Sequence, residues 1–236
     1  MGRLYAAGGD RRRGGRRAVS RAASAPPPKP AKPPRVWQRM LSGRRLDLLD
    51  PSPFDVEIAD IAHGLARVAR WNGQTLGDHA FSVAQHSLIV EEIVAETEPD
   101  PRWRLAALLH DGPEYVIGDM IAPFKSVLGG DYKSVEKRLQ AAIHGRFGLP
   151  AILPPAVARL VKSADRVSAY YEAQLLAGFT AAEAASLFGR PGAASLAEAR
   201  FVPQPAASVG AAYLARFEAL DRLVHPASPP PRKSST

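Results

Sequence analysis

The stretch ALLHDGPEYVIGD, residues 107–119, places four ionisable side chains directly after a short apolar run. His110 and Asp111 are adjacent, and Glu114 and Asp119 follow them. The apolar residues before His110 are typical of a helix that packs against a core. Two interpretations are open from this stretch alone. The four side chains are either a metal site with its acid–base group or the solvated end of a helix.

Two more polar residues lie inside apolar helical patterns elsewhere in the chain. His86 lies within FSVAQHSLIV, and Asp165 lies within VKSADRVSAYY. A carboxylate in such a setting needs a partner, because an isolated buried charge is costly. Nitrogen and carboxylate ligands together suit Mn, Co, Zn or Fe. One divalent cation would account for four residues at once, namely His86, His110, Asp111 and Asp165.

Most of the chain has the apolar periodicity of helices, with steps of three and four residues. Asp100 followed by Pro101 is a typical helix start. No run of strictly alternating residues between turn signals requires a strand. We therefore expect an all-α fold, a single helical bundle over residues 36–225. The expected helices lie in residues 56–71, 79–96, 100–111, 131–148, 154–178, 180–189 and 208–224.

The net charge of +8 over 236 residues belongs to the ends of the chain. Residues 1–35 hold ten Lys and Arg against one acid, whereas residues 36–226 hold 19 basic and 22 acidic residues, a charge of −3. The segment 1–35 is rich in Arg, Pro and Gly, so we expect it to be disordered, like the tail 226–236. The basic tail either contacts nucleic acid or is a solvated extension, including one created by an upstream start codon.

Several classes of protein are excluded by composition. The chain has no cysteine, so disulfides and thiolate metal ligands are ruled out. No apolar stretch approaches the ~18 residues that span a bilayer. The Arg-rich N-terminal segment lacks the apolar run of a secretory signal. We therefore expect a cytoplasmic protein that does not contact membranes.

The His, His–Asp and Asp order resembles the signature of HD-domain metal-dependent phosphohydrolases. The segments HDGPEYVIGDMIAPFK and ARW are similar to the bacterial 5′-deoxynucleotidase branch of that superfamily. The segments SGRRLDLLDPSP and FSVAQHS look closer to the related deoxynucleoside triphosphohydrolase branch. The resemblance covers roughly residues 37–178. It implies an HD-domain fold, a dimer or larger homo-oligomer, and a metal held by His86, His110, Asp111 and Asp165.

Two acids are candidates for the catalytic steps. Glu114 lies four residues after His110, so both share one face if the helix continues. Glu114 is then placed to orient or deprotonate the attacking water. The resemblance assigns Asp119 to the 3′-hydroxyl of a deoxyribose or to the acid–base step.

Three residues are candidates for substrate binding. Arg70 offers a planar fork that suits phosphate oxygens, and Lys125 would be a second, weaker phosphate contact. Trp71 would pack against the sugar, disfavouring a 2′-hydroxyl, or stack on a base.

A bound cation would polarise a phosphoryl oxygen and lower the pKa of a bound water. We expect hydrolysis of a nucleotide, preferably a deoxynucleotide, with 5′-monophosphate cleaved to nucleoside and phosphate as the leading reaction. The alternative within the class is a triphosphohydrolase that releases tripolyphosphate. An alternative outside it is a non-enzymatic, nucleic-acid-associated protein whose HD domain senses a nucleotide.

Overall fold

The computed structural model describes residues 35–128, 130–192 and 196–226, and these residues are mostly helical, as predicted. The predicted tails lie outside them, except for Arg35 and Pro226. None of the helices in this described part is both long and apolar enough to cross a membrane. The helices are α1 (Ile58–Leu65), α2 (Val83–Ala95), α3 (Pro101–Leu108), α4 (Glu114–Ile117), α5 (Ala122–Leu128), α6 (Gly130–Arg146), α7 (Pro155–Leu175), α8 (Ala181–Phe188) and α9 (Ala206–Val224).

A short hairpin, which no pattern in the sequence indicated, precedes the helices of the otherwise all-α fold. Strand β1 (Trp37–Arg39) pairs antiparallel with β2 (Arg45–Asp47). Ser42, in the turn between them, anchors the hairpin to α1, because its backbone N–H and its hydroxyl both donate to the carboxylate of Asp60. Each strand has only three residues, too few for an alternating pattern to appear in the sequence.

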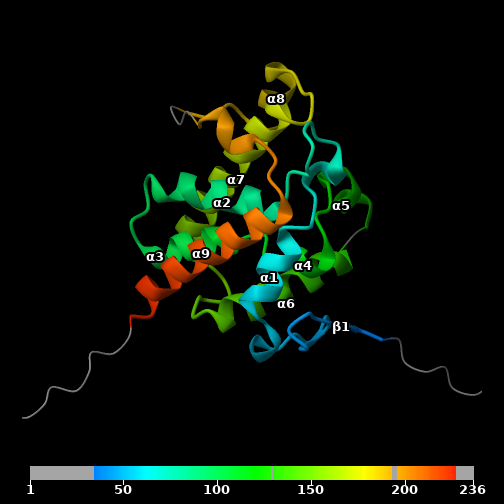
Figure 1. The fold of residues 1–236 in the computed structure, drawn as a ribbon, viewed down its shortest axis with the longest axis vertical. Helices are drawn as coiled ribbons and strands as arrows, with labels where there is room; N and C mark the ends of the chain where they lie inside the picture. Colours follow the sequence, from blue (N-terminus) through cyan, green and yellow to red (C-terminus); the bar gives the residue numbers. More distant parts are fainter. Residues whose placement is uncertain (1–34, 129, 193–195, 227–236) are drawn as a thin grey trace, which may run out of the picture. The chain divides into compact units, whose positions relative to one another are not determined.

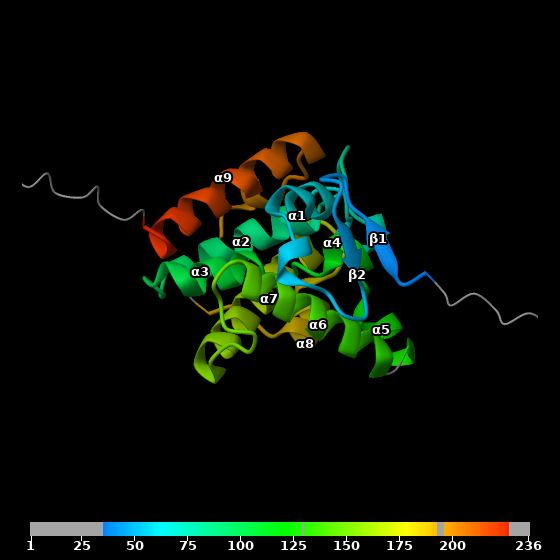
Figure 2. The ribbon, with the colours of Figure 1, turned by 90° about the horizontal axis from the view of Figure 1, so that it is seen from below.

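Helix α2 is the central element of the helical array. It packs against α3, α7 and α9, and Figures 1 and 2 show it among these helices. The helix starts at Val83, because the Ser82 hydroxyl accepts a hydrogen bond from the Gln85 backbone. Because other helices cover α2 on several sides, most of its side chains are buried. His86, one turn into α2, is accordingly 0% exposed.

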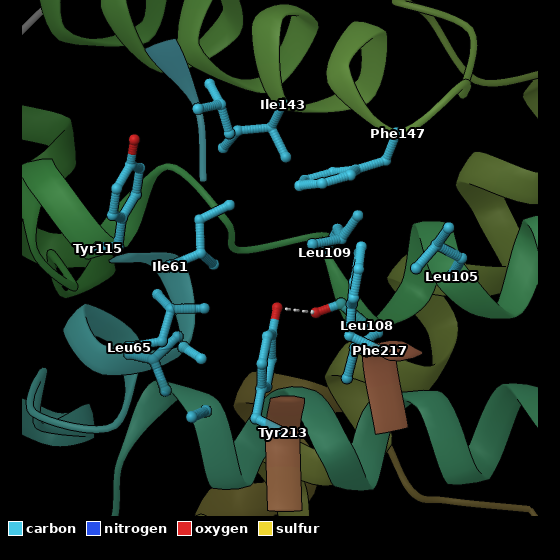
Figure 3. Packing of buried hydrophobic residues seen from close by; sticks show 14 of the residues in the cluster. Ile61, Leu65, Leu105, Leu108, Leu109, Tyr115, Ile143, Phe147, Tyr213 and Phe217 are labelled. Atoms are coloured by element: carbon cyan, nitrogen blue, oxygen red, sulfur yellow. Dashed lines mark hydrogen bonds between the residues drawn. The ribbon is translucent and has the colours of Figure 1, made fainter. Parts of the chain in front are cut away.

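The main hydrophobic core fills the space between α1, α3, α6 and α9 (Figure 3). The Tyr213 hydroxyl of α9 reaches into this core and donates to the Leu108 carbonyl, at 2.9 Å. Leu108 is the last residue of α3 and lies two residues before His110. The core therefore fixes the end of the helix from which the predicted His–Asp pair emerges. Its largest side chains come from these four helices and from the residues that directly follow α3 and α6, and include Ile61, Leu65, Leu105, Leu109, Ile143, Phe147, Tyr213 and Phe217.

A close approach between α1 and α4 sets the position of Glu114. A Cβ atom added at Gly64 of α1 would lie 2.8 Å from the Cβ of Tyr115 and 3.0 Å from its carbonyl oxygen. Real Cβ contacts do not reach the first of these distances, so a larger residue at Gly64 would push the two helices apart. Glycine at this position therefore lets α4 pack directly on α1, with Glu114 at its first residue.

Candidate metal centre and active site

Two histidine rings face each other where α2 meets the turn that follows α3. His86 Nε2 and His110 Nε2 lie 3.3 Å apart, although the two residues are separated by 24 positions in the sequence. The His86 ring is fully buried, and the His110 side chain is only 10% exposed. The structure thus brings together the two histidines that were predicted as metal ligands.

Two carboxylates lie beside these rings. Asp111 Oδ2 is 3.5 Å from His86 Nε2 and 3.3 Å from His110 Nε2. Asp165, which comes from α7, places Oδ1 3.3 Å from His86 Nε2. The ligand atoms of His86, His110 and Asp165 all lie within 4.8 Å of one another. We call His86, His110, Asp111 and Asp165 the histidine–aspartate cluster.

The hydrogen bonds of the two imidazoles direct their free lone pairs into this cluster. His86 Nδ1 lies 2.6 Å from Glu172 Oε1, and His110 Nδ1 lies 2.8 Å from the Ala107 carbonyl oxygen. Both partners are acceptors, so Nδ1 carries the proton in each neutral ring and Nε2 is free to accept. Two imidazole nitrogens and two carboxylates then converge as acceptors. This set fits a divalent cation.

The charged groups around His86 and Asp111 decide which protonation state a cation would meet. Burial and the nearby Arg70 lower the pKa of His86, but the carboxylates of Glu172 and Asp165 outweigh them and raise it to about 9. Burial also opposes ionisation of Asp111, yet the adjacent histidines hold the pKa of that carboxyl well below its usual range. At neutral pH the cluster therefore holds a proton on His86. A bound cation would have to displace that proton.

The sequence reasoning did not identify Glu172, although this carboxylate connects most of the site. Its Oε1 lies 2.6 Å from His86 Nδ1 and accepts from Ser168 Oγ at 2.8 Å. Its Oε2 accepts from Arg70 Nε at 3.1 Å and from Trp71 Nε1 at 2.9 Å. Burial raises the pKa of Glu172, but the opposing effect of Arg70 and His86 is larger, so the pKa is lowered to about 2. Glu172 is therefore ionised and fixes the ring of a ligand histidine.

A signal for Glu172 was present in the sequence. Asp165, Ser168 and Glu172 are spaced by three and four residues, so they lie on one face of α7. A polar row of this kind on a helix that also buries apolar residues indicates an interior polar network. The prediction included only its first member, Asp165.

Arg70 lies in the site, but not on a helix as predicted. Helix α1 ends at Leu65, and Arg70–Gly73 forms a 3-10 turn. The backbone directly before this turn is extended, and the Arg70 N–H donates to the Phe81 carbonyl at 2.8 Å instead of to a helix carbonyl. The predicted helix over residues 56–71 was therefore too long at its C-terminal end.

Both the indole N–H and the ring of Trp71 contact other residues of the protein. Its φ of 57° is in the left-handed region, which is unusual for a residue with a large side chain. Such a conformation persists only where the surroundings enforce it. Here the ring packs against Phe179 and Phe188, with centroid distances of 5.6 and 5.9 Å, while the indole N–H donates to Glu172. Trp71 thus positions Glu172, and its contact with a sugar or base stays a prediction.

The outer edge of the Arg70 guanidinium faces two acids of the site. Arg70 Nη1 lies 3.9 Å from Asp111 Oδ2 and 3.8 Å from Asp119 Oδ2. The Arg70 side chain is only 13% exposed, and the Asp119 side chain only 8%. Burial raises the pKa of Asp119, although Arg70 opposes this effect. The structure thus places both predicted residues at the edge of the histidine–aspartate cluster.

Glu114 lies in the site, but the helix that was to carry it there is interrupted. Helix α3 ends at Leu108, and α4 starts anew at Glu114 after the Gly112–Pro113 turn. The Glu114 side chain is 4% exposed, and its Oε1 lies 3.7 Å from Lys125 Nζ. Its Oε2 is buried without a hydrogen-bond partner among the described residues. Lys125 therefore neighbours Glu114, and its contact with a phosphate stays a prediction.

The protonation state of Glu114 follows from its surroundings. Burial raises the pKa of Glu114, and the carboxylates of Asp111 and Asp119 raise it further, to about 9. In the absence of a cation this carboxyl therefore holds a proton at neutral pH. A group whose pKa is displaced toward or above neutrality, beside a ligand cluster, is typical of acid–base catalysts.

Glu172→Gln is expected to weaken Mn²⁺ binding by about 10- to 100-fold. The amide would present an N–H₂ donor toward His86 Nδ1, which favours the tautomer whose Nε2 carries a proton and cannot bind metal. Calorimetric titration of chelator-treated protein with Mn²⁺ measures the effect. Glu218→Gln, at an exposed position of α9, is the matched control and should bind Mn²⁺ like the wild type. Equal affinity in both variants would refute the positioning role of Glu172.

Comparisons with known proteins give relatives without a stated activity. The chain is 58% identical over 190 residues to the uncharacterized protein RCAP_rcc00048 of Rhodobacter capsulatus. The aligned region spans 80% of this chain and 97% of that protein. It is 34% identical over 113 residues to the uncharacterized protein YfdR of Escherichia coli. This aligned region spans 48% of this chain and 57% of YfdR. No family model matches the chain.

Proposed function

The chain belongs to the same family as RCAP_rcc00048 of Rhodobacter capsulatus, and we propose that it is a metal-dependent phosphohydrolase that acts on 5′-deoxynucleotides. One observation carries the proposal. Two imidazole Nε2 atoms 3.3 Å apart, both with Nδ1 satisfied, converge with Asp111 and Asp165 beside a largely buried arginine. The resemblance of this residue order to HD-domain phosphohydrolases supports the same assignment.

The residues that would hold the metal are His86, His110, Asp111 and Asp165. A nitrogen and carboxylate set of this kind suits Mn, Co, Zn or Fe. When bound, such a cation supplies a Lewis acid for phosphoryl oxygen and lowers the pKa of water. Glu172 keeps the His86 ring oriented for the ligand role.

Arg70 is the residue best placed to bind the phosphate. Its Nε is occupied by Glu172, so the guanidinium is fixed in orientation, and Nη1 faces the cluster near Asp111 and Asp119. A guanidinium fixed in this way offers charge-assisted hydrogen bonds to phosphate oxygens at little entropic cost. Lys125 adds a second positive charge beside Glu114. The positive charges of these two side chains together balance the charge of one phosphate dianion.

Glu114 would handle the proton of the attacking water. Its buried Oε2 has no protein partner in the described part of the chain and is therefore available to a water or a leaving group. A cation bound beside Glu114 would favour the ionised carboxylate, which can accept a proton from the water and return it to the departing alcohol oxygen. Asp119, close to Arg70, is left for the 3′-hydroxyl of the sugar, in line with the resemblance.

A substrate panel tests the proposed function. Full-length protein is assayed with Mn²⁺ or Co²⁺ on deoxynucleoside and ribonucleoside 5′-monophosphates and on deoxynucleoside triphosphates, and the released product is identified. We expect inorganic phosphate, released faster from deoxynucleoside monophosphates than from ribonucleotides. Tripolyphosphate release would contradict the monophosphate assignment. Metal binding without turnover of any nucleotide would contradict the phosphohydrolase assignment as a whole.

Arg70→Lys is expected to lower kcat/KM at least tenfold. The variant retains the positive charge but loses the fork that contacts Glu172 and a phosphate together, and a charged hydrogen bond contributes about 1.5–3 kcal/mol. Initial rates across substrate concentrations measure the change. Arg67→Lys is the matched control, because Arg67 is exposed and its Nη1 donates only to the His63 carbonyl, so its kinetics should be unchanged. If Arg70→Lys keeps wild-type kcat/KM, Arg70 does not bind the phosphate.

A further inference from the structure

A strongly basic cavity lies beside Asp165 of the histidine–aspartate cluster. It has a volume of about 500 Å³ and is formed by α7 and the segment that follows α8. Its charged lining residues are Arg159, Lys162, Arg166 and Arg190, and no acidic residue of the described chain lines it. We call this cavity the basic groove. A volume of this size accommodates a small-molecule ligand.

The cations of the basic groove are largely uncompensated. Arg159, Arg166 and Arg190 have no carboxylate partner within residues 35–128, 130–192 and 196–226. Arg166 is held against the wall of the groove because its Nε donates to the Phe188 carbonyl at 3.0 Å. Like charges gathered around one concave surface repel one another, so the arrangement is favourable only toward an anion.

The basic groove and the metal centre share a wall but no lining residue. Asp165 directs Oδ1 toward His86, whereas its Oδ2 accepts from Lys162 Nζ at 2.6 Å on the side of the groove. Phe188 lines the groove and also packs against Trp71. None of the predicted catalytic, substrate-binding or metal residues lines the groove. It is therefore a separate site whose occupant would contact Lys162, the partner of a cluster carboxylate.

We propose that the basic groove binds a chain of phosphates, either inorganic or carried by a nucleotide. Four cations around about 500 Å³ match the several negative charges of a polyphosphate, whereas a single phosphate would leave most of them uncompensated. Arginine, which provides three of the four, offers bidentate contacts to phosphate oxygens. The proposal concerns binding to the metal-free protein and does not depend on the proposed hydrolytic function.

The test uses the full-length, chelator-treated protein and inorganic tripolyphosphate as the probe. Arg159→Ala/Arg190→Ala removes two exposed groove cations and leaves Lys162 and its contact with Asp165 intact. We expect tripolyphosphate affinity, measured by calorimetry, to fall at least tenfold in this variant. The matched control, Lys137→Ala/Arg138→Ala, removes the same charge from an exposed part of α6 and should change affinity less than threefold. The basic residues 1–35 are common to all three proteins, so the difference reports the groove.

Two further probes identify the source of the phosphates. A deoxynucleoside triphosphate that binds more tightly than tripolyphosphate, with the excess lost in the groove variant, supports a nucleotide ligand. Equal affinity for both supports recognition of the phosphate chain alone. A ten-residue single-stranded DNA that binds more tightly than either, with sensitivity to the groove variant, overturns the proposal in favour of nucleic acid. Unchanged tripolyphosphate affinity in the groove variant also overturns it.

Discussion

Asp111→Ala is expected to abolish both Mn²⁺ binding and phosphate release. Asp111 Oδ2 lies 3.5 Å from His86 Nε2 and 3.3 Å from His110 Nε2, so the substitution removes a carboxylate that faces both ligand rings. A loss of about 4 kcal/mol of charge stabilisation corresponds to about a 1000-fold lower kcat. Calorimetric titration with Mn²⁺ and the rate of phosphate release measure the two effects.

The control for Asp111→Ala is Asp78→Ala, at an exposed position between α1 and α2. Thermal unfolding adds a readout that does not depend on activity. Mn²⁺ at about 100 times its Kd stabilises a native protein by about 2.7 kcal/mol, which raises the unfolding midpoint of the wild type and of the control. Asp111→Ala should unfold at the same temperature with and without Mn²⁺. A midpoint that still rises with Mn²⁺ would show that Asp111 is not a ligand.

The helices whose ends depend on local chemistry were predictable from the sequence. Asp100 and Pro101 start α3 as expected, because the Asp100 carboxylate accepts from the Arg102 N–H at 2.9 Å, and proline at the first position loses no helical hydrogen bond. The turn between α3 and α4 also has a local cause in the sequence, because Gly112 and Pro113 interrupt the helix before Glu114.

The errors in the predicted fold occur where the partner is distant in sequence. Helix α1 stops before Val68, because Val68 accepts from Val83 N–H and the neighbouring Ala69 forms a bridge with Ser82. The apolar period up to Val68 is compatible with a longer helix, so only these contacts decide its end. The β1–β2 hairpin is likewise fixed by the contact of Ser42 with Asp60.

His86 and Asp165 were predictable because each is a polar residue within an apolar helical pattern, and His110 and Asp111 were predictable because they directly follow one. Glu172 differs in that its role depends on how elements pack. Its partners Arg70 and Trp71 are 102 and 101 residues away, and His86 is 86 residues away. A helical period shows that Glu172 shares a face with Asp165, but it does not show which side chains meet that face. The packing of α2 against α7 provides this information.

Glu114→Gln is expected to lower kcat by about 100- to 10,000-fold while leaving Mn²⁺ affinity within threefold of the wild type. The amide has the same size and burial but cannot accept and return a proton. Because glutamine does not titrate, the pH profile of the residual activity should lack the limb that Glu114 produces. Steady-state rates across pH and a Mn²⁺ titration separate a lost proton transfer from a lost metal.

The ion pair with Lys125 needs its own control, because Glu114→Gln removes both a proton acceptor and a partner of that lysine. Lys125 Nζ lies 3.7 Å from Glu114 Oε1 and 3.6 Å from Glu136 Oε1. Glu136→Gln therefore removes the other carboxylate on Lys125 without touching the buried one, and should change kcat less than threefold. Equal losses in the two variants would assign the effect to Lys125. Full kcat in Glu114→Gln would mean that another group transfers the proton, and Asp119, near Arg70, would be the residue to replace next.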